Sequence, residues 1–377
     1  MDAKGLTAPC CKFIVDNEDE YILPSIYELD SLNGLHNTDV YKRLRSDIES
    51  NKKSFSCSNC WKLEENGLES RRENINKNFN HSDYKEGYIQ DMDITLDFAC
   101  NMMCRICGPH SSSKWNAARN VIDLMRNSGA VNVRHQTESN IEYQKRFRKV
   151  IENTDLSYVR LIRIQGGETF YSKNLEWFID KLYIEVKEPD KLELIFITNC
   201  SIFPDDNLLK KILHFKSPVI QASIDGVGEL ANVTRWGVSW DTVSEVCKKW
   251  SAVRDEYPKL YLNVNCTVSL LNVNKLQEVL EFFRPLNFNV SFNRLHNPNY
   301  LSVSMVPTST REKWILDPND KKFNRTITQH NNYLKSSLVT ENNFNIFLKA
   351  TKILDQYQNN CFESVNKEIY DLANQMV

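Results

Sequence analysis

Three closely spaced cysteines, Cys100, Cys104 and Cys107, are the residues of this chain best suited to chemistry. They lie in the run DITLDFACNMMCRICGPH and have the spacing C-x3-C-x2-C. Three thiolates can each bind one iron of a cubane 4Fe-4S cluster, which leaves the remaining iron open to a small molecule. The alternatives are a set of buried thiols or a zinc site, for which His110 is a loose candidate for a further ligand. The odd-numbered triplet favours the cluster, because zinc sites usually combine two C-x2-C pairs or Cys with His.

A second motif, Gly166-Gly167-Glu168, directly follows a run that reads as a buried strand, residues 158–164, and Gln165. Glycines at the end of a strand let a ligand approach the backbone closely. The neighbouring carboxylate can accept charge-assisted hydrogen bonds from an ammonium group. Alone, the motif also fits an ordinary strand-to-helix turn, but behind the cysteine loop it indicates a binding site.

The cysteine loop after a first strand, followed by Gly-Gly-Glu after a second, resembles the radical S-adenosylmethionine (radical SAM) enzymes. The resemblance implies that the three cysteines hold a 4Fe-4S cluster and that Gly-Gly-Glu binds the amino group of S-adenosylmethionine. It also implies reductive cleavage of this cofactor to methionine and a 5′-deoxyadenosyl radical, which abstracts hydrogen from a substrate. Such an enzyme needs an external one-electron reductant, such as a flavodoxin or ferredoxin.

Further polar residues extend the resemblance. Thr198-Asn199 ends a third expected strand where many relatives have Thr-Asn-Gly, and Cys200 replaces that glycine, so we expect a differently shaped turn. A fourth strand leads into Ser223-Ile224-Asp225-Gly226, with Arg235 downstream, which is similar to the "SIDG … R … G" stretch of radical SAM enzymes that modify peptides. The resemblance implies that Ser223 and Arg235 contact the methionine carboxylate or the ribose; a turn residue and a solvated helix face are the alternatives. The implied cofactor-binding residues are Ile106, Gly166, Gly167, Glu168, Thr198, Asn199, Ser223, Asp225 and Arg235. Ile106 occupies a position where relatives often have an aromatic residue, and we expect it to pack beside the adenine.

The amino-terminal part contains a second cysteine group, Cys10, Cys11, Cys57 and Cys60. The pattern resembles the "PCC … CxxC-W-x-x-E-E-x-G" arrangement that precedes the barrel in twitch-type radical SAM proteins, which carry an auxiliary site in a module related to SPASM domains. Four thiolates can hold a second iron–sulfur cluster or a structural zinc. The site can use all four cysteines, keep one open iron, or be degenerate, because relatives usually have a further cysteine upstream.

The order of expected elements defines the fold class as α/β. Strands and helices alternate between residues 91 and 295, which is typical of a parallel sheet. Strands are expected at 92–98, 158–164, 191–198, 219–224, 260–267 and 287–293, and helices at 112–127, 141–153, 240–256 and 273–283. The six strands fit the partial (β/α)6 TIM-like barrel of the resembled family, in which chemistry lies at the carboxyl ends of the strands.

We divide the chain into a small cysteine-containing amino-terminal module of the twitch/SPASM-like kind (1–90), the barrel (91–295) and an α-rich carboxyl-terminal extension (296–377). The extension is expected to close the open barrel, with helices from residue 344 onward. Cys361 in this part is expected to be buried rather than a metal ligand.

Composition limits the possible partners and location. Hydrophobic residues make up 41% and charged residues 25% of the 377 residues, as in a globular protein with a sizeable core. The net charge of −2 gives no general attraction to nucleic acid or membranes, and no apolar run approaches the roughly 18 residues that span a bilayer. Eleven cysteines and a start without the apolar segment of a signal peptide indicate a reducing, cytoplasmic environment.

These observations leave hypotheses of different classes. The leading one is a radical SAM enzyme that modifies a peptide or protein side chain. The second is a radical SAM enzyme that acts on a nucleotide, a sugar or another small metabolite. The third is a non-catalytic iron–sulfur or zinc-binding interaction protein with a degenerate barrel, which the intact cysteine triplet and Glu168 argue against. Formation of 5′-deoxyadenosine separates the enzymes from the binding protein.

Trp115 and Trp236 are expected to be packing residues.

Overall fold

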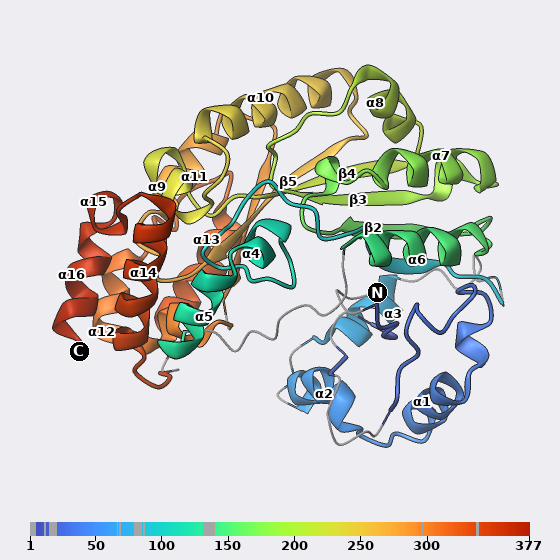
Figure 1. The fold of residues 1–377 in the computed structure, drawn as a ribbon, viewed down its shortest axis with the longest axis horizontal. Helices are drawn as coiled ribbons and strands as arrows, with labels where there is room; N and C mark the ends of the chain where they lie inside the picture. Colours follow the sequence, from blue (N-terminus) through green and yellow to red (C-terminus); the bar gives the residue numbers. More distant parts are fainter. Residues whose placement is uncertain are drawn as a thin grey trace.

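The centre of the fold is a parallel sheet of six strands, ordered β1 to β6 as they occur along the chain (Figure 1). The computed structural model describes residues 5–10, 13–14, 21–65, 67, 69–78, 85, 87–130, 140–295, 297–336 and 339–377. The strands are β1 (Asp91–Thr95), β2 (Leu161–Gln165), β3 (Glu193–Thr198), β4 (Ser217–Ser223), β5 (Tyr261–Val268) and β6 (Asn289–Arg294). All neighbouring strands are parallel, and in the described residues β1 and β6 lie at opposite edges of the sheet. The expected α/β class with a partial TIM-like barrel is confirmed.

Helices connect successive strands and cover one side of the sheet (Figure 1). The connecting helices are α4 (Ser113–Ala117), α5 (Arg119–Asn127), α6 (Asn140–Glu152), α7 (Leu175–Glu185), α8 (Asp206–Leu213), α9 (Gly228–Thr234), α10 (Trp240–Glu256) and α11 (Leu276–Phe283). The predicted helix at 240–256 is confirmed residue for residue. The predicted helix at 112–127 is instead two helices, because Ala118 leaves the helical conformation at φ −88° and ψ 53°.

The first strand is shorter than predicted, and the reason bears on the site. β1 ends at Thr95 rather than at residue 98. Beyond it the chain leaves the regular ladder, because the carbonyls of Asp97 and Ala99 accept hydrogen bonds from the amides of Gly167 and Glu168 at 3.0 and 2.8 Å. The residues predicted to complete the strand therefore begin the cysteine loop.

The two faces of the sheet differ in burial, as the alternation of side chains in a strand requires. Ile164, Phe196 and Val264 are fully buried, while their strand neighbours are partly exposed. Stacked rings join Phe196 to Phe170, and Phe170 contacts Trp250 of α10. The fully buried rows therefore face the helices, and the opposite face carries polar side chains such as Gln221 and Asn263 beside the partly buried Ile195 and Ile197.

The amino-terminal part comprises the 3-10 helices η1 (Leu35–Asn37) and η2 (Phe55–Cys57) and the helices α1 (Asp39–Glu49), α2 (Ser58–Glu65) and α3 (Arg71–Asn78). It is fixed to α6 by Arg146, whose guanidinium donates to the carbonyls of Ile26 and Leu29 at 2.5 and 2.7 Å. The Leu32 amide also donates to Thr154 Oγ1 at 2.9 Å. These contacts hold the amino-terminal part beside the first crossover.

The carboxyl-terminal extension contains mostly helices, as expected. They are α12 (Thr308–Arg311), α13 (Asn324–Leu334), α14 (Phe344–Gln358), α15 (Phe362–Val365) and α16 (Lys367–Gln375), with the 3-10 turns η6 (Asn299–Leu301), η7 (Val303–Met305) and η8 (Glu312–Trp314). α13 contacts β6, α14 contacts α5, and α15 contacts α9 (Figure 1). The expectation that Cys361 is buried is wrong: it precedes α15 at the surface and is exposed, because the helix places Phe362 in the core instead. No helix in the described parts of the chain has the length and apolar character to cross a membrane.

The contact between α6 and α7 gives a direct test of this packing. Phe147 of α6 is fully buried. The centre of its ring lies 6.3 Å from each of the ring centres of Tyr143, Trp177 and Phe178. Replacing it with alanine should lower the free energy of unfolding by about 3–5 kcal/mol, because it removes a large buried ring and leaves a cavity. Urea unfolding of Phe147→Ala against the parent measures the change. Ile184→Ala, at a side chain that is 80% exposed, is the control and should change stability by no more than about 0.5 kcal/mol. Equal effects of the two substitutions would contradict this packing.

Candidate active site

The residues predicted to do chemistry gather at the carboxyl ends of β1 to β4. The cysteine loop follows β1, Gly166 to Glu168 follows β2, Thr198 ends β3 and Ser223 ends β4. Because the strands are parallel and adjacent, their carboxyl ends lie at one edge of the sheet. The structure thus brings together motifs that are more than a hundred residues apart in the sequence.

Backbone hydrogen bonds hold the cysteine loop from two sides. On one side lies the turn after β2, as described above. On the other side, the amides of Met103 and Arg105 donate to the carbonyls of Trp236 and Thr234 at 2.7 and 2.9 Å. The indole N–H of the buried Trp115 donates to the Cys104 carbonyl at 2.8 Å. Trp115 thus packs against the loop, while Trp236 holds it through its backbone carbonyl.

Two glycines allow the loop to lie this close to its neighbours. A Cβ on Gly167 would lie 2.3 Å from the Ala99 carbonyl oxygen, and one on Gly166 would lie 2.6 Å from the Asp97 carbonyl oxygen. Real Cβ atoms do not approach backbone oxygen this closely, so only glycine fits. In the Gly-Gly-Glu motif the glycines therefore serve first to admit the cysteine loop.

The three thiols interact electrostatically. The Cys107 thiol donates to Cys104, which lowers the pKa of Cys104 below the ordinary thiol value and raises the pKa of Cys107 well above it. Burial raises the pKa of Cys100 to about 12, and the nearby Cys104 adds to that rise. The hydrogen bond between the Cys104 and Cys107 sulfurs favours a thiolate in this pair, and the thiolate is the form that binds metal.

The donor set fits a cluster better than one metal ion. Within the described ranges, no three Cys, His, Asp or Glu side chains converge on a position that could hold a single metal ion. A cubane cluster does not require such convergence, because each thiolate binds a different iron. Three mutually interacting sulfurs on one loop, with the Arg235 guanidinium close to Cys104 and Cys107, suit an anionic iron–sulfur group.

Glu168 is buried, with 1% of its surface exposed, and its carboxylate is held by three donors. Thr198 Oγ1 and the Asn199 amide each donate to it at 2.6 Å, and the Phe170 amide donates at 3.0 Å. Burial nevertheless raises the pKa of Glu168 above its ordinary value, although these hydrogen bonds oppose the shift. A bound ammonium group would stabilise the charged form, because a carboxylate has about four acceptor positions. The contact between Glu168 and a ligand stays a prediction.

Arg235 and Asp225 form a buried ion pair beside the cysteine loop. Arg235 Nη1 and Asp225 Oδ2 are 2.6 Å apart, and the side chains are 11% and 5% exposed. Asp225 also accepts a hydrogen bond from the Thr267 amide at 2.8 Å. The structure therefore contradicts a solvated helix face for Arg235. Its buried Nε has no acceptor among the described residues, which fits a ligand that brings its own oxygen.

A small cavity adjoins this ion pair. It is lined by Met102, Asn199, Ile224, Arg235 and Trp240, among others. Its walls are mainly apolar, and Asn199 and Arg235 contribute an amide and a guanidinium to the lining. Ile106 is partly buried against the core, and Ser223 is partly buried at the end of β4. The contacts of these two residues with a cofactor stay predictions.

The turn after β3 contains a left-handed residue that is not glycine. Cys200 adopts this conformation, with φ +56°, and its side chain is fully buried in contact with Cys247. The expectation of a turn shaped differently from that of the relatives stays a prediction. Burial of the thiol compensates for the conformational cost that a residue other than glycine has at this position.

The amino-terminal cysteines lie on neighbouring segments. Cys10 is in a loop, Cys57 ends η2 and Cys60 lies in α2, and all are partly buried; Cys11 lies outside the described residues. The Ile14 amide donates to the Ser56 carbonyl at 2.9 Å, which joins the loop of Cys10 to the segment of Cys57. A metal site at these cysteines stays a prediction.

Several residues that shape the site have no recognisable local pattern in the sequence. Asp97 is completely buried and accepts hydrogen bonds from the Ala99 amide, Ser172 and Gln144. Arg105, inside the cysteine loop, is buried by the carboxyl-terminal helices. Their partners lie tens to hundreds of residues away, so spacing could not have found them.

Comparisons with known proteins give limited similarities. No protein-family model matches the chain, and no curated protein matches it. Among solved structures the chain is similar to anSMEcpe with bound AdoMet and a Cp18Cys peptide, with 16% identity, a TM-score of 0.37, and coverage of 59% of this chain and 56% of that one. It is also similar to Streptococcus suis SuiB bound to S-adenosylmethionine, with 12% identity, a TM-score of 0.37, and coverage of 88% and 70%. The chain thus spans a little over half the length of the first of these. At these TM-scores and identities the similarity does not establish a function for this chain.

The close approach at Gly167 generates a prediction. Gly167→Ala should reduce the iron bound per chain after anaerobic reconstitution, because the new methyl group displaces the cysteine loop. Such overpacking should also lower the free energy of unfolding by about 1–3 kcal/mol. Iron analysis and urea unfolding measure the two effects. The control is Gly67→Ala, where φ is +68° but no atom lies within 4 Å of the added Cβ, so only conformational strain is introduced. A Gly167→Ala protein that binds as much iron as the parent would contradict this role.

Proposed function

We propose that the chain is a radical SAM enzyme, with a 4Fe-4S cluster held by Cys100, Cys104 and Cys107. The observation that carries the proposal is the meeting of the cysteine loop with Gly-Gly-Glu and the buried Arg235–Asp225 pair at one end of a parallel sheet. When bound, the cluster would supply the electron that splits the carbon–sulfur bond of S-adenosylmethionine. A flavodoxin- or ferredoxin-type reductant would provide that electron.

The residues of this chain would bind and orient the cofactor and exclude water. Glu168 would accept hydrogen bonds from the ammonium group of the methionine moiety. Arg235, with its unpaired Nε, and Ser223 would donate to the carboxylate or the ribose. Thr198 and Asn199 keep Glu168 in place through their 2.6 Å hydrogen bonds. The burial of this carboxylate and guanidinium strengthens their interactions with charged groups of a ligand.

For the substrate, we infer a peptide or a protein side chain. The support is the resemblance of the stretch Ser223 to Gly226 to peptide-modifying enzymes, together with the polar face of the sheet. Gln221 and Asn263 are register partners on that face, and Asn293 donates to Asn265 further along it. Amide side chains both donate and accept, which suits peptide groups. A sugar or nucleotide offers similar groups, so a small polar metabolite is the second candidate.

The cysteine content of the chain predicts a cytoplasmic location.

Anaerobic reconstitution with iron and sulfide, followed by an assay for 5′-deoxyadenosine, tests the proposed function. The parent, given S-adenosylmethionine and a strong reductant, should form 5′-deoxyadenosine. Cys104→Ala should lower the amount of 5′-deoxyadenosine to that found in a reaction without protein, because a thiolate ligand of the cluster is lost. Cys361→Ser, at an exposed cysteine outside the loop, is the control and should match the parent. A Cys104→Ala protein as active as the parent would show that this is not a radical SAM enzyme.

The auxiliary site has a separate test. If a second cluster is bound by Cys10, Cys11, Cys57 and Cys60, the reconstituted parent should contain about eight irons per chain. If only the barrel cluster is present, it should contain about four. The double substitution Cys57→Ala and Cys60→Ala should then lower the count to about four. Zinc analysis of the same samples distinguishes a structural zinc. An unchanged iron and zinc content in the double variant would rule out a metal at these cysteines.

A further inference from the structure

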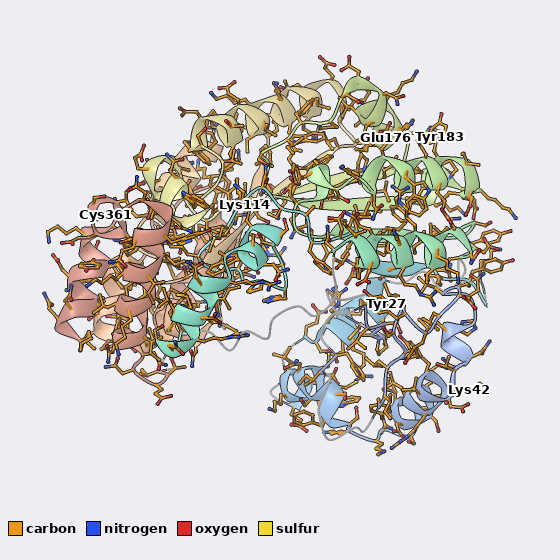
Figure 2. The ribbon with its side chains drawn as sticks, in the orientation of Figure 1. Tyr27, Lys42, Lys114, Glu176, Tyr183 and Cys361 are labelled. Atoms are coloured by element: carbon orange, nitrogen blue, oxygen red, sulfur yellow. The ribbon has the colours of Figure 1, made fainter. Side chains whose placement is uncertain are left out.

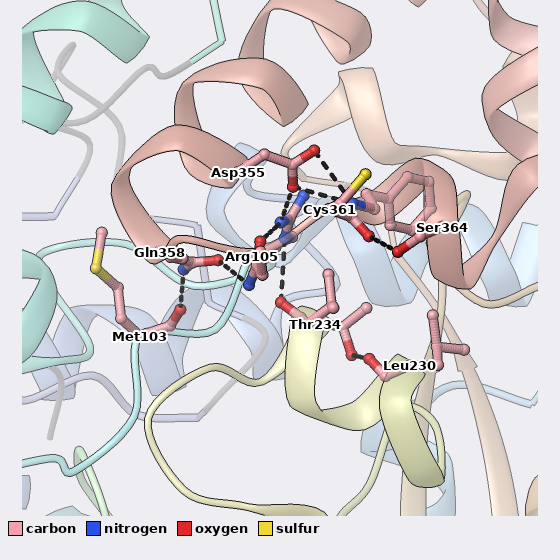
Figure 3. Close-up of polar contacts among 11 residues, drawn as sticks. Met103, Arg105, Leu230, Thr234, Asp355, Gln358, Cys361 and Ser364 are labelled. Carbon is pink, nitrogen blue, oxygen red and sulfur yellow. Dashed lines mark hydrogen bonds and ion pairs between the residues drawn. The ribbon is translucent and has the colours of Figure 1, made fainter.

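A fully buried arginine lies inside the cysteine loop. Arg105 separates Cys104 from Ile106, and its side chain is only 1% exposed. Its guanidinium lies against Asp355 of α14 (Figure 3). A charged side chain is buried this completely only when it is paired.

The partners of this guanidinium come mainly from the carboxyl-terminal extension. Arg105 Nη2 forms an ion pair with Asp355 of α14 and donates to Asn360 Oδ1 at 2.7 Å. Its Nε donates to the Val233 carbonyl at 3.1 Å, and its charge lies 5.7 Å from the centre of the Phe362 ring. Its Nη1 has no partner in the described chain. Asp355 is therefore the only carboxylate paired with this buried charge in the described chain.

A second contact from the same turn reaches the other side of Cys104. Gln358, the last residue of α14, is buried and donates through Nε2 to the Met103 carbonyl at 3.1 Å (Figure 3). Asp355 itself accepts hydrogen bonds from the Phe362 amide at 3.1 Å, which fix the turn between α14 and α15. The two residues that flank Cys104 are thus both held by the end of α14.

We propose that Asp355 is a positioning residue for the cluster: through Arg105, and together with Gln358, it fixes the backbone on both sides of Cys104. The inference rests on the proposed function, because it assigns a purpose to the cysteine loop. It extends that function by making the carboxyl-terminal helices part of the metal site. In Figure 1, α14 lies beside α5 and α15 lies beside α9, and Figure 2 shows the side chains in the same orientation.

The test uses Asp355→Asn in the full chain. This substitution keeps the size of the side chain but leaves the buried guanidinium without its compensating charge. Changes in groups that orient metal ligands typically weaken metal binding by about 10- to 100-fold. The rate at which an iron chelator removes iron from the reconstituted protein should therefore rise at least about tenfold. In the metal-free protein, iodoacetamide should alkylate the buried Cys104 faster than in the parent, as mass spectrometry of the peptides would show.

The chain contains a matched control. Asp320 also belongs to the extension, pairs with an arginine of the barrel, Arg284, and accepts a hydrogen bond from a phenylalanine amide, that of Phe323 at 2.9 Å. Among the described residues, this pair makes no hydrogen bond or ion pair with the cysteine loop. Asp320→Asn should leave both the iron-release rate and the alkylation of Cys104 at the parent values.

The outcomes separate a positioning role from general destabilisation. If Asp355→Asn releases iron and is alkylated at the same rates as the parent, the inference is overturned. Equal changes of these rates in Asp355→Asn and Asp320→Asn would also overturn it. If Asp355→Asn does not fold, Gln358→Leu replaces it: faster iron release and alkylation support the inference, and parent rates overturn it. If the parent binds no cluster, the proposed function fails, while alkylation of the metal-free protein still decides whether Asp355 positions Cys104.

Discussion

The site depends on one close contact, between the loop after β1 and the turn after β2. The loop can carry three cysteines to the edge of the sheet only because Gly166 and Gly167 have no side chains, which would overlap the carbonyls of Asp97 and Ala99. The same backbone segments then exchange hydrogen bonds that replace the ladder of β1. This geometry fixes Glu168 next to the loop, because its own amide donates to Ala99. The two motifs are therefore one structural unit.

Charge balance is the second constraint on this unit. Thiols, Glu168 and Asp225 would repel one another as anions in a buried region, and the Arg235 guanidinium lies among them. Asp225 is held by the Thr267 amide and by Asn272, which donates to its carbonyl at 2.6 Å. A fixed cation in a region of low dielectric stabilises thiolates far more than it would in water. The arrangement thus favours the ionised cysteines that metal binding requires.

Local patterns predicted the barrel, whereas long-range contacts could not be predicted from them. Strand-forming runs followed by Gly-Gly-Glu or Ser-Ile-Asp-Gly predicted β2 and β4 and placed both motifs at the carboxyl ends of these strands. The exact end of β1 was missed, because it depends on hydrogen bonds to residues 167 and 168. Cys200 shows that a buried thiol can occupy a left-handed turn where glycine is usual. The exposure of Cys361 and the pairing of Arg105 with Asp355 depend on how the carboxyl-terminal helices dock, which no local pattern encodes.

The central claim is that three cysteines hold a cluster with one iron open to S-adenosylmethionine. Electron paramagnetic resonance of the reduced, reconstituted protein, recorded with and without S-adenosylmethionine, tests it most directly. The account predicts the signal of a reduced 4Fe-4S cluster whose shape changes when the cofactor is added, because the cofactor binds the open iron. A spectrum that the cofactor leaves unchanged, or zinc bound in place of iron at Cys100, Cys104 and Cys107, would contradict the account.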